Sequence, residues 1–321
     1  MQDTHFSLPL LAVVGPSASG KSSLAIQLAK RLDGEIISVD SQQIYRGLTI
    51  GTGKVTTAEM EGIPHHLLDI REPNELYDAK QFQQDADRIV RDIASRGKVV
   101  ILAGGTGLYL RALIRGLFDT PADLEVRARW NEEADKQGLI ALHQQLQQVD
   151  PVSAERINPN DRLRIVRALE VCEVAGRPMS ELFAEHQQTP PRYKNVLQLG
   201  LNPPRPLLYE RIEQRIQGML DEGWLEEVRA LRAQGYGSEL KAMQCIGYLE
   251  LNRFLDEQES WEETHRLMIK ATKTYARRQL TWFRKEEVQW YESASELLEE
   301  PQEWNKVLEF LGREKADSGE E

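Results

Sequence analysis

The segment Gly15–Ser22 constrains the fold of this chain more than any other part of its sequence. Its letters, GPSASGKS, fit the pattern G-x-x-x-x-G-K-[ST], in which a glycine-rich turn, a lysine and a hydroxyl surround phosphate groups. An apolar run over 8–14 precedes it, and leucines at helical spacing follow it. A strand, a glycine loop and a helix in this order predict a phosphate site facing backbone N–H groups and a helix N-terminus. The predicted site comprises Gly15, Pro16, Ser17, Ala18, Ser19, Gly20, Lys21 and Ser22, with the Ser22 hydroxyl as a ligand for Mg²⁺.

Further apolar runs predict the rest of a parallel sheet. A run over 35–39 follows the first helix, so the chain opens with a βαβ unit whose strands are parallel. Runs over 98–102 and 195–200 predict two more strands, whereas 108–183 has a helical, charged pattern broken by prolines. We therefore expect an α/β fold: a P-loop NTPase-like parallel sheet core with a helical insertion domain and a helical C-terminal region. The expected division is 1–107, 108–190 and 191–321.

Composition narrows the class of protein. The chain has 321 residues, of which 40% are apolar and 28% charged, and these values are typical of a globular protein. No apolar run approaches the roughly 20 residues that cross a bilayer, and the first residues lack the pattern of a signal peptide. The two cysteines, Cys172 and Cys245, form neither a disulfide framework nor a usual zinc site. We expect a cytoplasmic monomer without membrane contact.

Charge is distributed unevenly along the chain. The net charge is −11, and the segment 286–321 alone contains twelve acidic and three basic residues, which gives −9. The preceding segment, 270–285, contains six basic residues and no acidic one. Helical spacing places Lys270, Lys273, Arg277 and Arg284 on one face. Such a face is typical of binding to a phosphate backbone, although a solvated helix face produces the same pattern.

A carboxylate lies where the predicted second strand ends, at Asp40. The usual P-loop NTPase carries an aspartate at the end of another buried strand, but the run over 98–102 ends in Ala103 and two glycines. Asp40 is expected at the same sheet edge as the phosphate loop, where it could hold Mg²⁺ or accept a proton. Two other glycine-rich segments, 47–54 and 104–107, are interpreted as a mobile loop and a tight turn. The adjacent His65 and His66 are interpreted as structural.

Taken together, these motifs resemble the bacterial tRNA dimethylallyltransferases, also called tRNA isopentenyltransferases, of the IPP transferase family. The matching segments occur in order from about residue 11 to 284: 15–22, ISVDSQQIY at 37–45, IGT at 50–52, PHHLLD at 64–69, GGTGLY at 104–109, ND at 160–161, RALE at 167–170, IGY at 246–248 and RQLTW at 278–282. The strand-end Asp-Ser-x-Gln together with the phosphate loop is far more specific than that loop alone. Many relatives have threonine where this chain has Ser17, and the hydroxyl is retained.

The resemblance implies a reaction and a set of residues for it. The reaction is transfer of a dimethylallyl group from dimethylallyl diphosphate to N6 of adenosine 37, beside the anticodon of tRNA, with release of diphosphate. In this family the acid–base residue falls on Asp40, the adenine-holding threonine on Thr106, the diphosphate-binding lysine on Lys21 and an assisting basic residue on Arg215. The implied tRNA contacts are Asp40, Ser41, Gln42, Gln43, Thr106, Arg127, Leu163, Arg164, Ile165, Val166, Arg167, Gln244, Cys245, Ile246, Gly247, Tyr248, Leu249, Lys273, Arg277, Arg278 and Arg284.

Three alternatives share parts of this pattern. A P-loop nucleoside or nucleotide kinase would bind ATP and would not need a basic helix. An RNA-binding module without catalysis would not need Lys21, Ser22 and Asp40. An enzyme that prenylates free AMP would need neither the helical insertion nor the basic helix. Incubation with ATP, dimethylallyl diphosphate and tRNA separates the kinase from the transferase.

Overall fold

The computed structural model describes residues 7–118 and 123–314, which form two compact units. The first unit combines Met1–Gly116 with Arg192–Glu321, and the second is Leu117–Pro191. The insertion was expected to begin at 108, whereas the second unit begins at Leu117. The difference arises because helix α3 (Gly107–Arg115) packs against the first unit's own helix α2 (Ala79–Ser95).

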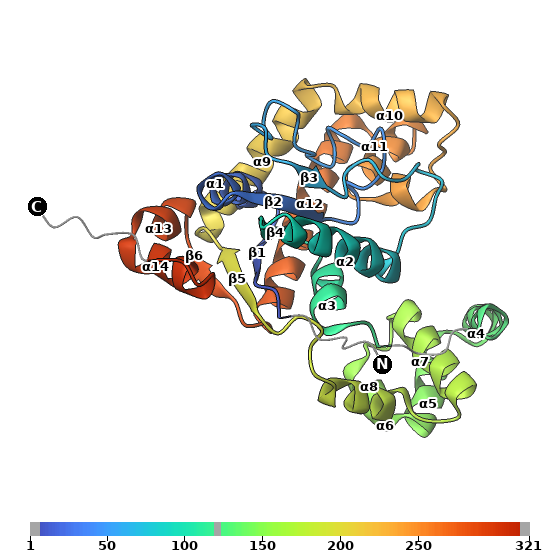
Figure 1. The fold of residues 1–321 in the computed structure, drawn as a ribbon. Helices are drawn as coiled ribbons and strands as arrows, with labels where there is room; N and C mark the ends of the chain where they lie inside the picture. Colours follow the sequence, from blue (N-terminus) through green and yellow to red (C-terminus); the bar gives the residue numbers. More distant parts are fainter. Residues whose placement is uncertain (1–6, 119–122, 315–321) are drawn as a thin grey trace, which may run out of the picture. The chain divides into compact units, whose positions relative to one another are not determined.

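A six-stranded parallel sheet forms the centre of the first unit (Figure 1). Its strand order is β3-β2-β4-β1-β5-β6, which confirms the predicted α/β class. The strands are β1 Leu10–Val14, β2 Gly34–Val39, β3 His65–His66, β4 Val99–Gly104, β5 Val196–Leu201 and β6 Gln289–Tyr291. The two outermost strands were not predicted, because two or three residues are too few to display a strand period. The chain leaves β1 toward β2 on one side and later returns to β5 on the other. Ligands bind at such a reversal in open α/β sheets.

Alternate residues of the central strand β1 enter two separate cores. Leu11 and Val13 belong to the core that contains α1 (Lys21–Leu32), whereas Leu10, Ala12 and Val14 belong to the core on the opposite face. All five side chains are buried, as expected for a strand covered on both faces. The opposite face is covered by α2, α3, α9 (Arg205–Asp221), α10 (Trp224–Ala233), α11 (Tyr248–Leu255) and α12 (Trp261–Phe283).

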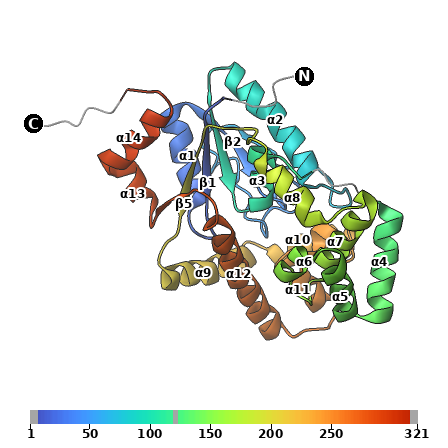
Figure 2. The same ribbon diagram turned by 90° about the horizontal axis from the view of Figure 1, so that it is seen from below.

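The described part of the acidic C-terminal segment, 286–314, packs on the core that contains α1 and is not a free tail. Helices α13 (Ala294–Glu299) and α14 (Pro301–Phe310) bury Leu297, Leu298, Val307 and Leu308 in the core that contains α1. Figure 2 shows these two helices beside α1. The predicted helical C-terminal region also contains a short strand, β6, which pairs with β5 before these helices begin. Removal of the whole segment after Lys285 would remove this strand and both helices.

The described part of the second unit contains helices joined by short loops and no strand. Its helices are α4 Leu124–Gln137, α5 Leu139–Val149, α6 Pro151–Arg156, α7 Arg162–Ala175 and α8 Met179–Gln188. Leu142 and Leu146 of α5 pack with Ile165 and Leu169 of α7 in a small core of its own. The fully buried Asp150 carboxylate accepts hydrogen bonds from the N–H and hydroxyl groups of Ser153 and Ser180, and so ties the starts of α6 and α8 together. In neither unit is a described helix long and apolar enough to span a membrane.

Candidate active site

The phosphate loop has the strained geometry that its glycines allow. Gly15 has a φ of +138°, and a Cβ atom there would lie 2.4 Å from the Leu201 carbonyl oxygen of β5. Gly20, with a φ of +96°, precedes the first residue of α1, Lys21. The Lys21 Nζ donates to the Pro16 carbonyl oxygen at 2.5 Å. Burial and the positive charge of Arg215 lower the pKa of Lys21 to about 7, although Asp40 opposes this shift. An anion bound in the loop would restore the charge of this lysine.

Asp40 and Thr106 are brought together because β2 and β4 are neighbours in the sheet. Val39 pairs with Gly104, so the two strands end side by side. The Asp40 Oδ1 accepts the N–H groups of Gln42 and Gln43 at 2.8 and 3.3 Å, and the Thr106 Oγ1 accepts the Ser41 N–H at 3.2 Å. These contacts fix the turn after β2 and occupy one oxygen of the carboxylate. Within the described part of the chain the other oxygen, Oδ2, accepts no hydrogen bond, so it is free to accept a proton.

A cavity of about 380 Å³ opens between the phosphate loop and the helices that cover this sheet face. Lys21, Ser22, Asp40 and Arg215 line its polar side. Its apolar wall is formed by Ile212, Ile216, Met219, Trp224 and Ile246. The cavity therefore joins a cationic phosphate site to an apolar surface, an arrangement suited to a diphosphate that carries a small apolar group. Thr106 is not among the lining residues, although the neighbouring Gly105 is.

Helix α12 supplies three lining residues, Thr272, Tyr275 and Gln279, to which the sequence analysis gave no role, although Gln279 lies in the RQLTW segment. The Gln279 Oε1 accepts the Ser17 N–H at 2.9 Å, and its Nε2 donates to the Gly105 carbonyl oxygen at 3.1 Å. One side chain thus bridges the phosphate loop and the loop after β4. Burial raises the pKa of Tyr275 to about 12, and its hydrogen bonds to Thr106 and Gln279 oppose this shift. Tyr275 and Gln279 lie beside the basic residues that drew attention to the helix, and only the tertiary structure shows which way they face.

The glycines of the segment 104–107 are explained by close approach. A Cβ atom on Gly105 would lie 1.9 Å from the Gln279 Nε2, and one on Gly107 would lie 2.2 Å from the indole of Trp282. Side chains of the RQLTW segment therefore pack directly on the backbone of the GGTG segment. Gly104 ends β4 and Gly107 begins α3, so this segment is a two-residue connection between strand and helix that also packs against α12.

The proposed basic face of α12 is only partly free. Arg277 and Arg278 are exposed, and neither forms an ion pair with the described residues. Lys273, by contrast, forms an ion pair with Glu213 of α9 and lies 4.9 Å above the ring of Tyr209. Arg284 follows the last residue of the helix and is exposed. The prediction of a uniform basic stripe is therefore wrong at Lys273, whose charge is already compensated.

Residues 244–249 divide between the cavity and the core. Gln244, Cys245 and Ile246 line the cavity, and burial raises the pKa of the Cys245 thiol above its usual range. Gly247 and Tyr248 are buried against Trp224, and the Tyr248 hydroxyl donates to Glu227. The side chain of Tyr248 is consequently a packing element, while Leu249 is half-buried on α11.

The arginines of the second unit are organised by one buried carboxylate. Glu170 is fully buried, and it accepts two hydrogen bonds from Arg127, at 2.9 and 3.1 Å, and an ion pair from Arg167 at 2.8 Å. Ile165 and Val166 of the predicted contact segment are buried in the core of the unit, whereas Leu163 and Arg164 are exposed. The exposed surface of this segment is therefore restricted to the start of α7 and the two arginines that Glu170 holds.

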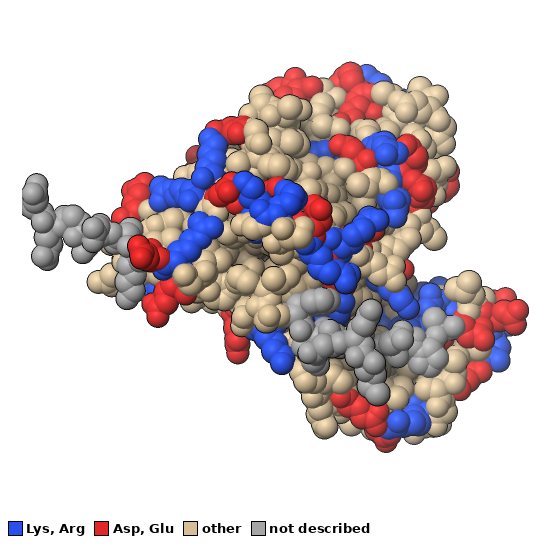
Figure 3. Space-filling view, viewed as in Figure 1, with Lys and Arg blue, Asp and Glu red and all other residues tan. Residues whose placement is uncertain are grey.

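Across the face drawn in Figure 3, basic and acidic side chains are interspersed. Many of the exposed cations form ion pairs, for example Arg88 with Asp85 and Arg229 with Glu226. Overall charge is therefore a poor guide to a polyanion surface in this protein, and individual unpaired cations are the better one.

The fold and the cavity define a P-loop protein of the α/β class whose phosphate site faces an apolar wall and an aspartate at the end of β2. The sequence profile of the IPP transferase family matches residues 43–286. A tRNA dimethylallyltransferase of Geobacter metallireducens is 47% identical over 285 residues, which cover 88% of this chain and 92% of that protein. The chain belongs to the IPP transferase family. This membership favours a transferase over the kinase alternative.

Another relative and two solved structures agree over nearly the whole chain. A tRNA dimethylallyltransferase 2 of Geotalea daltonii is 44% identical over 308 residues, covering 95% of this chain and 93% of that one. The full-length tRNA isopentenylpyrophosphate transferase of Bacillus halodurans has a TM-score of 0.69 at 37% identity, covering 95% of this chain and 97% of that one. A eukaryotic dimethylallyltransferase acting on tRNA has a TM-score of 0.81 at 27% identity and covers 97% of this chain and 82% of that one.

Proposed function

We propose that this protein transfers the dimethylallyl group of dimethylallyl diphosphate to N6 of adenosine 37 in tRNA and releases diphosphate. The observation that carries the proposal is the cavity itself, in which the phosphate loop, an apolar wall and the Asp40 carboxylate face one space. The apolar wall beside the phosphate loop suits the dimethylallyl part of this substrate. The relatives named as tRNA dimethylallyltransferases support the same reaction.

The chain's own residues account for each requirement of the transfer. As N6 forms its bond to the prenyl carbon, the amine becomes acidic, and the free oxygen of Asp40 takes its proton; such transfer is worth roughly 10²–10⁴-fold in rate. The bond from that carbon to the diphosphate oxygen breaks, and negative charge collects on the leaving group. Lys21 and Arg215 line the same cavity and would stabilise this charge together with N–H groups of the phosphate loop. Thr106 and the loop after β4 would border the adenine.

Mg²⁺ fits the donor atoms on the polar side of the cavity. The described residues contain no group of three or more His, Cys, Asp or Glu side chains that could hold a metal. Mg²⁺ is commonly held by few protein oxygens together with substrate phosphates and water. We propose that the exposed Ser22 hydroxyl contributes one ligand and the diphosphate others. The ion would add positive charge beside the leaving group.

We also propose an oligomeric state, a location and a tRNA-binding surface for the protein. We propose that the protein acts as a monomer in the cytoplasm, where tRNA is modified. The anticodon stem-loop of tRNA would contact the exposed cations Arg277 and Arg278 and, in the second unit, the arginines around Glu170.

The test is a single-turnover reaction of purified protein with labelled dimethylallyl diphosphate and an anticodon stem-loop, with the product nucleoside identified by mass spectrometry. Wild-type protein should form N6-dimethylallyl adenosine, and ATP should yield no phosphorylated nucleoside. Asp40→Asn should lower the transfer rate at least a hundredfold while tRNA binding is retained. Activity of Asp40→Asn within about threefold of wild type would remove Asp40 from the proton-accepting role.

A further inference from the structure

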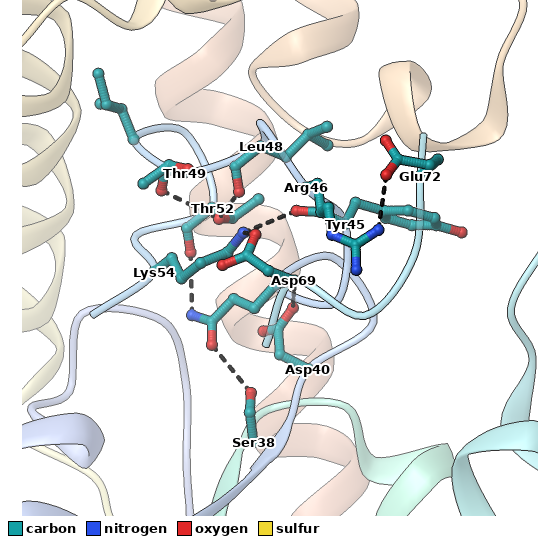
Figure 4. A network of polar contacts seen from close by, with 12 residues as sticks. Ser38, Asp40, Tyr45, Arg46, Leu48, Thr49, Thr52, Lys54, Asp69 and Glu72 are labelled. Carbon is teal, nitrogen blue, oxygen red and sulfur yellow. Dashed lines mark hydrogen bonds and ion pairs between the residues drawn. The ribbon is translucent and has the colours of Figure 1, made fainter. Parts of the chain in front are cut away.

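The glycine-rich segment 47–54 has no role in the proposed reaction, yet it is held firmly at the edge of the cavity. Figure 4 shows its polar contacts. The buried Lys54 ammonium donates to the Tyr45 carbonyl oxygen at 2.7 Å and to Asp69 at 2.5 Å. The Gln43 side chain donates to the carbonyl oxygens of Thr52 and Gly53, both at 3.3 Å, and accepts from the Ser38 hydroxyl at 3.0 Å. The interpretation of this segment as a mobile loop is therefore wrong.

The other end of the segment is clamped by a single carboxylate, Glu227 of α10. Its Oε2 accepts the N–H groups of Thr49 and Ile50 at 3.0 and 2.7 Å, and its Oε1 accepts the Gly51 N–H at 3.2 Å. The Tyr248 hydroxyl donates to the same group. Three consecutive N–H groups turned toward one point form an anion nest. Here the protein's own carboxylate fills the nest, so its function is to hold the loop rather than to bind a ligand.

The clamped segment ends against Arg215. Gly53 has a φ of +58°, and a Cβ atom there would lie 1.7 Å from the Arg215 Nη2 and 3.0 Å from the Met219 Cε. The guanidinium thus lies on the bare backbone of this glycine. Arg215 lines the cavity and forms no ion pair with the described residues, so its packing against Gly53 is one restraint on the guanidinium. An unrestrained arginine has several rotamers, and only a few of them would direct it at the diphosphate.

We propose that Glu227 is a positioning residue for Arg215: its carboxylate fixes the 49–54 loop, and Gly53 of that loop holds the guanidinium in the cavity beside Lys21 and Asp40. This inference rests on the proposed role of Arg215 toward the diphosphate. Gln43 and Lys54 fix the same loop from the side of β2. These contacts of Glu227, Gln43 and Lys54 with the loop, here called the clamp, would hold Arg215 at a fixed position relative to Lys21 and Asp40 before the substrate binds. Such fixed positions favour efficient orientation of the reacting groups.

The test is a double-mutant cycle between Glu227→Gln and Arg215→Ala, measured in two ways. One readout is kcat and KM for dimethylallyl diphosphate in transfer to an anticodon stem-loop, and the other is the Kd of inorganic diphosphate by calorimetry. Glu227→Gln should lower kcat/KM and weaken diphosphate binding about tenfold or more, since a misplaced group about 1 Å away can cost up to 10²-fold. In the Arg215→Ala background, Glu227→Gln should have less than a twofold further effect. Glu226→Gln is the matched control, because Glu226 is the preceding residue of α10 and, among residues 7–118 and 123–314, forms an ion pair with the exposed Arg229 alone.

Two outcomes would overturn the inference: effects of Glu227 and Arg215 that multiply in the double variant, or wild-type diphosphate affinity in Glu227→Gln. A structural defect alone would lower stability equally with and without Arg215, so it produces the first outcome. If Glu227→Gln does not fold, Gly53→Ala replaces it in the same cycle, because the atoms nearest to its methyl group are the ends of two flexible side chains, Arg215 and Met219. Failure of the proposed function is separate: the protein would not prenylate tRNA, while the cycle in diphosphate Kd would still report on the clamp.

Discussion

The pKa of Lys21 predicts that diphosphate binding takes up a proton. In the free protein this pKa is about 7, because burial and Arg215 disfavour the charged form. Bound diphosphate favours the ammonium, so the pKa rises on binding. At pH 8 a lysine of pKa 7 is about 10% protonated, and full protonation in the complex takes up about 0.9 proton. At pH 6 the lysine is already about 90% protonated, so the uptake falls to about 0.1 proton.

The direction of the pH effect follows from linkage. A lysine whose pKa is lowered in the free protein loses its charge as the pH rises through 7, whereas binding requires that charge. The affinity should therefore fall about tenfold per pH unit above 7, until the pH reaches the raised pKa of the complex. Diphosphate itself gains charge near neutrality and opposes this trend, so a reference variant is needed.

Calorimetry of diphosphate binding in buffers of different ionisation enthalpy measures the uptake directly. Lys21→Arg is the matched control, because a guanidinium keeps its charge throughout this pH range. At pH 8 the wild type should take up about 0.9 proton more than Lys21→Arg, and at pH 6 the two should be nearly equal. Equal uptake at pH 8 would refute the reasoning, since Lys21 would then already be charged in the free protein.

Three further predictions concern other parts of the molecule. Replacing both Arg277 and Arg278 by Ala should flatten the plot of log tRNA affinity against log salt by roughly 1.4, or about 0.7 per phosphate contact. Lys273→Ala should change this slope little, because Glu213 already neutralises Lys273. An unchanged slope in the double variant, measured by filter binding, would exclude this helix as a tRNA surface. Gln279→Ala should raise KM for both dimethylallyl diphosphate and tRNA, because it removes the partner of the Ser17 N–H and of the Gly105 carbonyl oxygen together. An effect on one substrate alone would show that the phosphate loop and the loop after β4 act independently. Hydrogen bonds from Arg96 and His66 lower the pKa of the buried Glu35 from 4.5 to about 2. Glu35→Gln should therefore cost about 3 kcal/mol of unfolding free energy at pH 7 and remove the loss of unfolding free energy that Glu35 causes between pH 4.5 and 2. A loss below about 1 kcal/mol in urea denaturation would contradict this assignment.

The sequence by itself determined the class of fold and the polar half of the site. The phosphate loop, Lys21 and Asp40 are identifiable because their spacing relative to strands and helices is local, and local geometry follows from residue type. The buried strands β1, β2, β4 and β5 were predicted to within a few residues for the same reason. The two short edge strands were not, because their pairing partners and not their own residues make them strands.

Only the tertiary structure decided which residues with similar sequence signals share a role. Lys273 and Arg277 are equivalent on a helical wheel, but α9 places a carboxylate beside Lys273 and leaves Arg277 exposed. Glu226 and Glu227 are adjacent acids, yet helix rotation turns one toward solvent and the other toward three N–H groups of a distant loop. Long-range contacts of this kind depend on how helices pack, and a side chain's neighbours across that packing are not encoded in the spacing of its own segment. The sequence therefore did not predict the apolar wall, the Gln279 bridge or the clamp on Arg215, which depend on the tertiary structure.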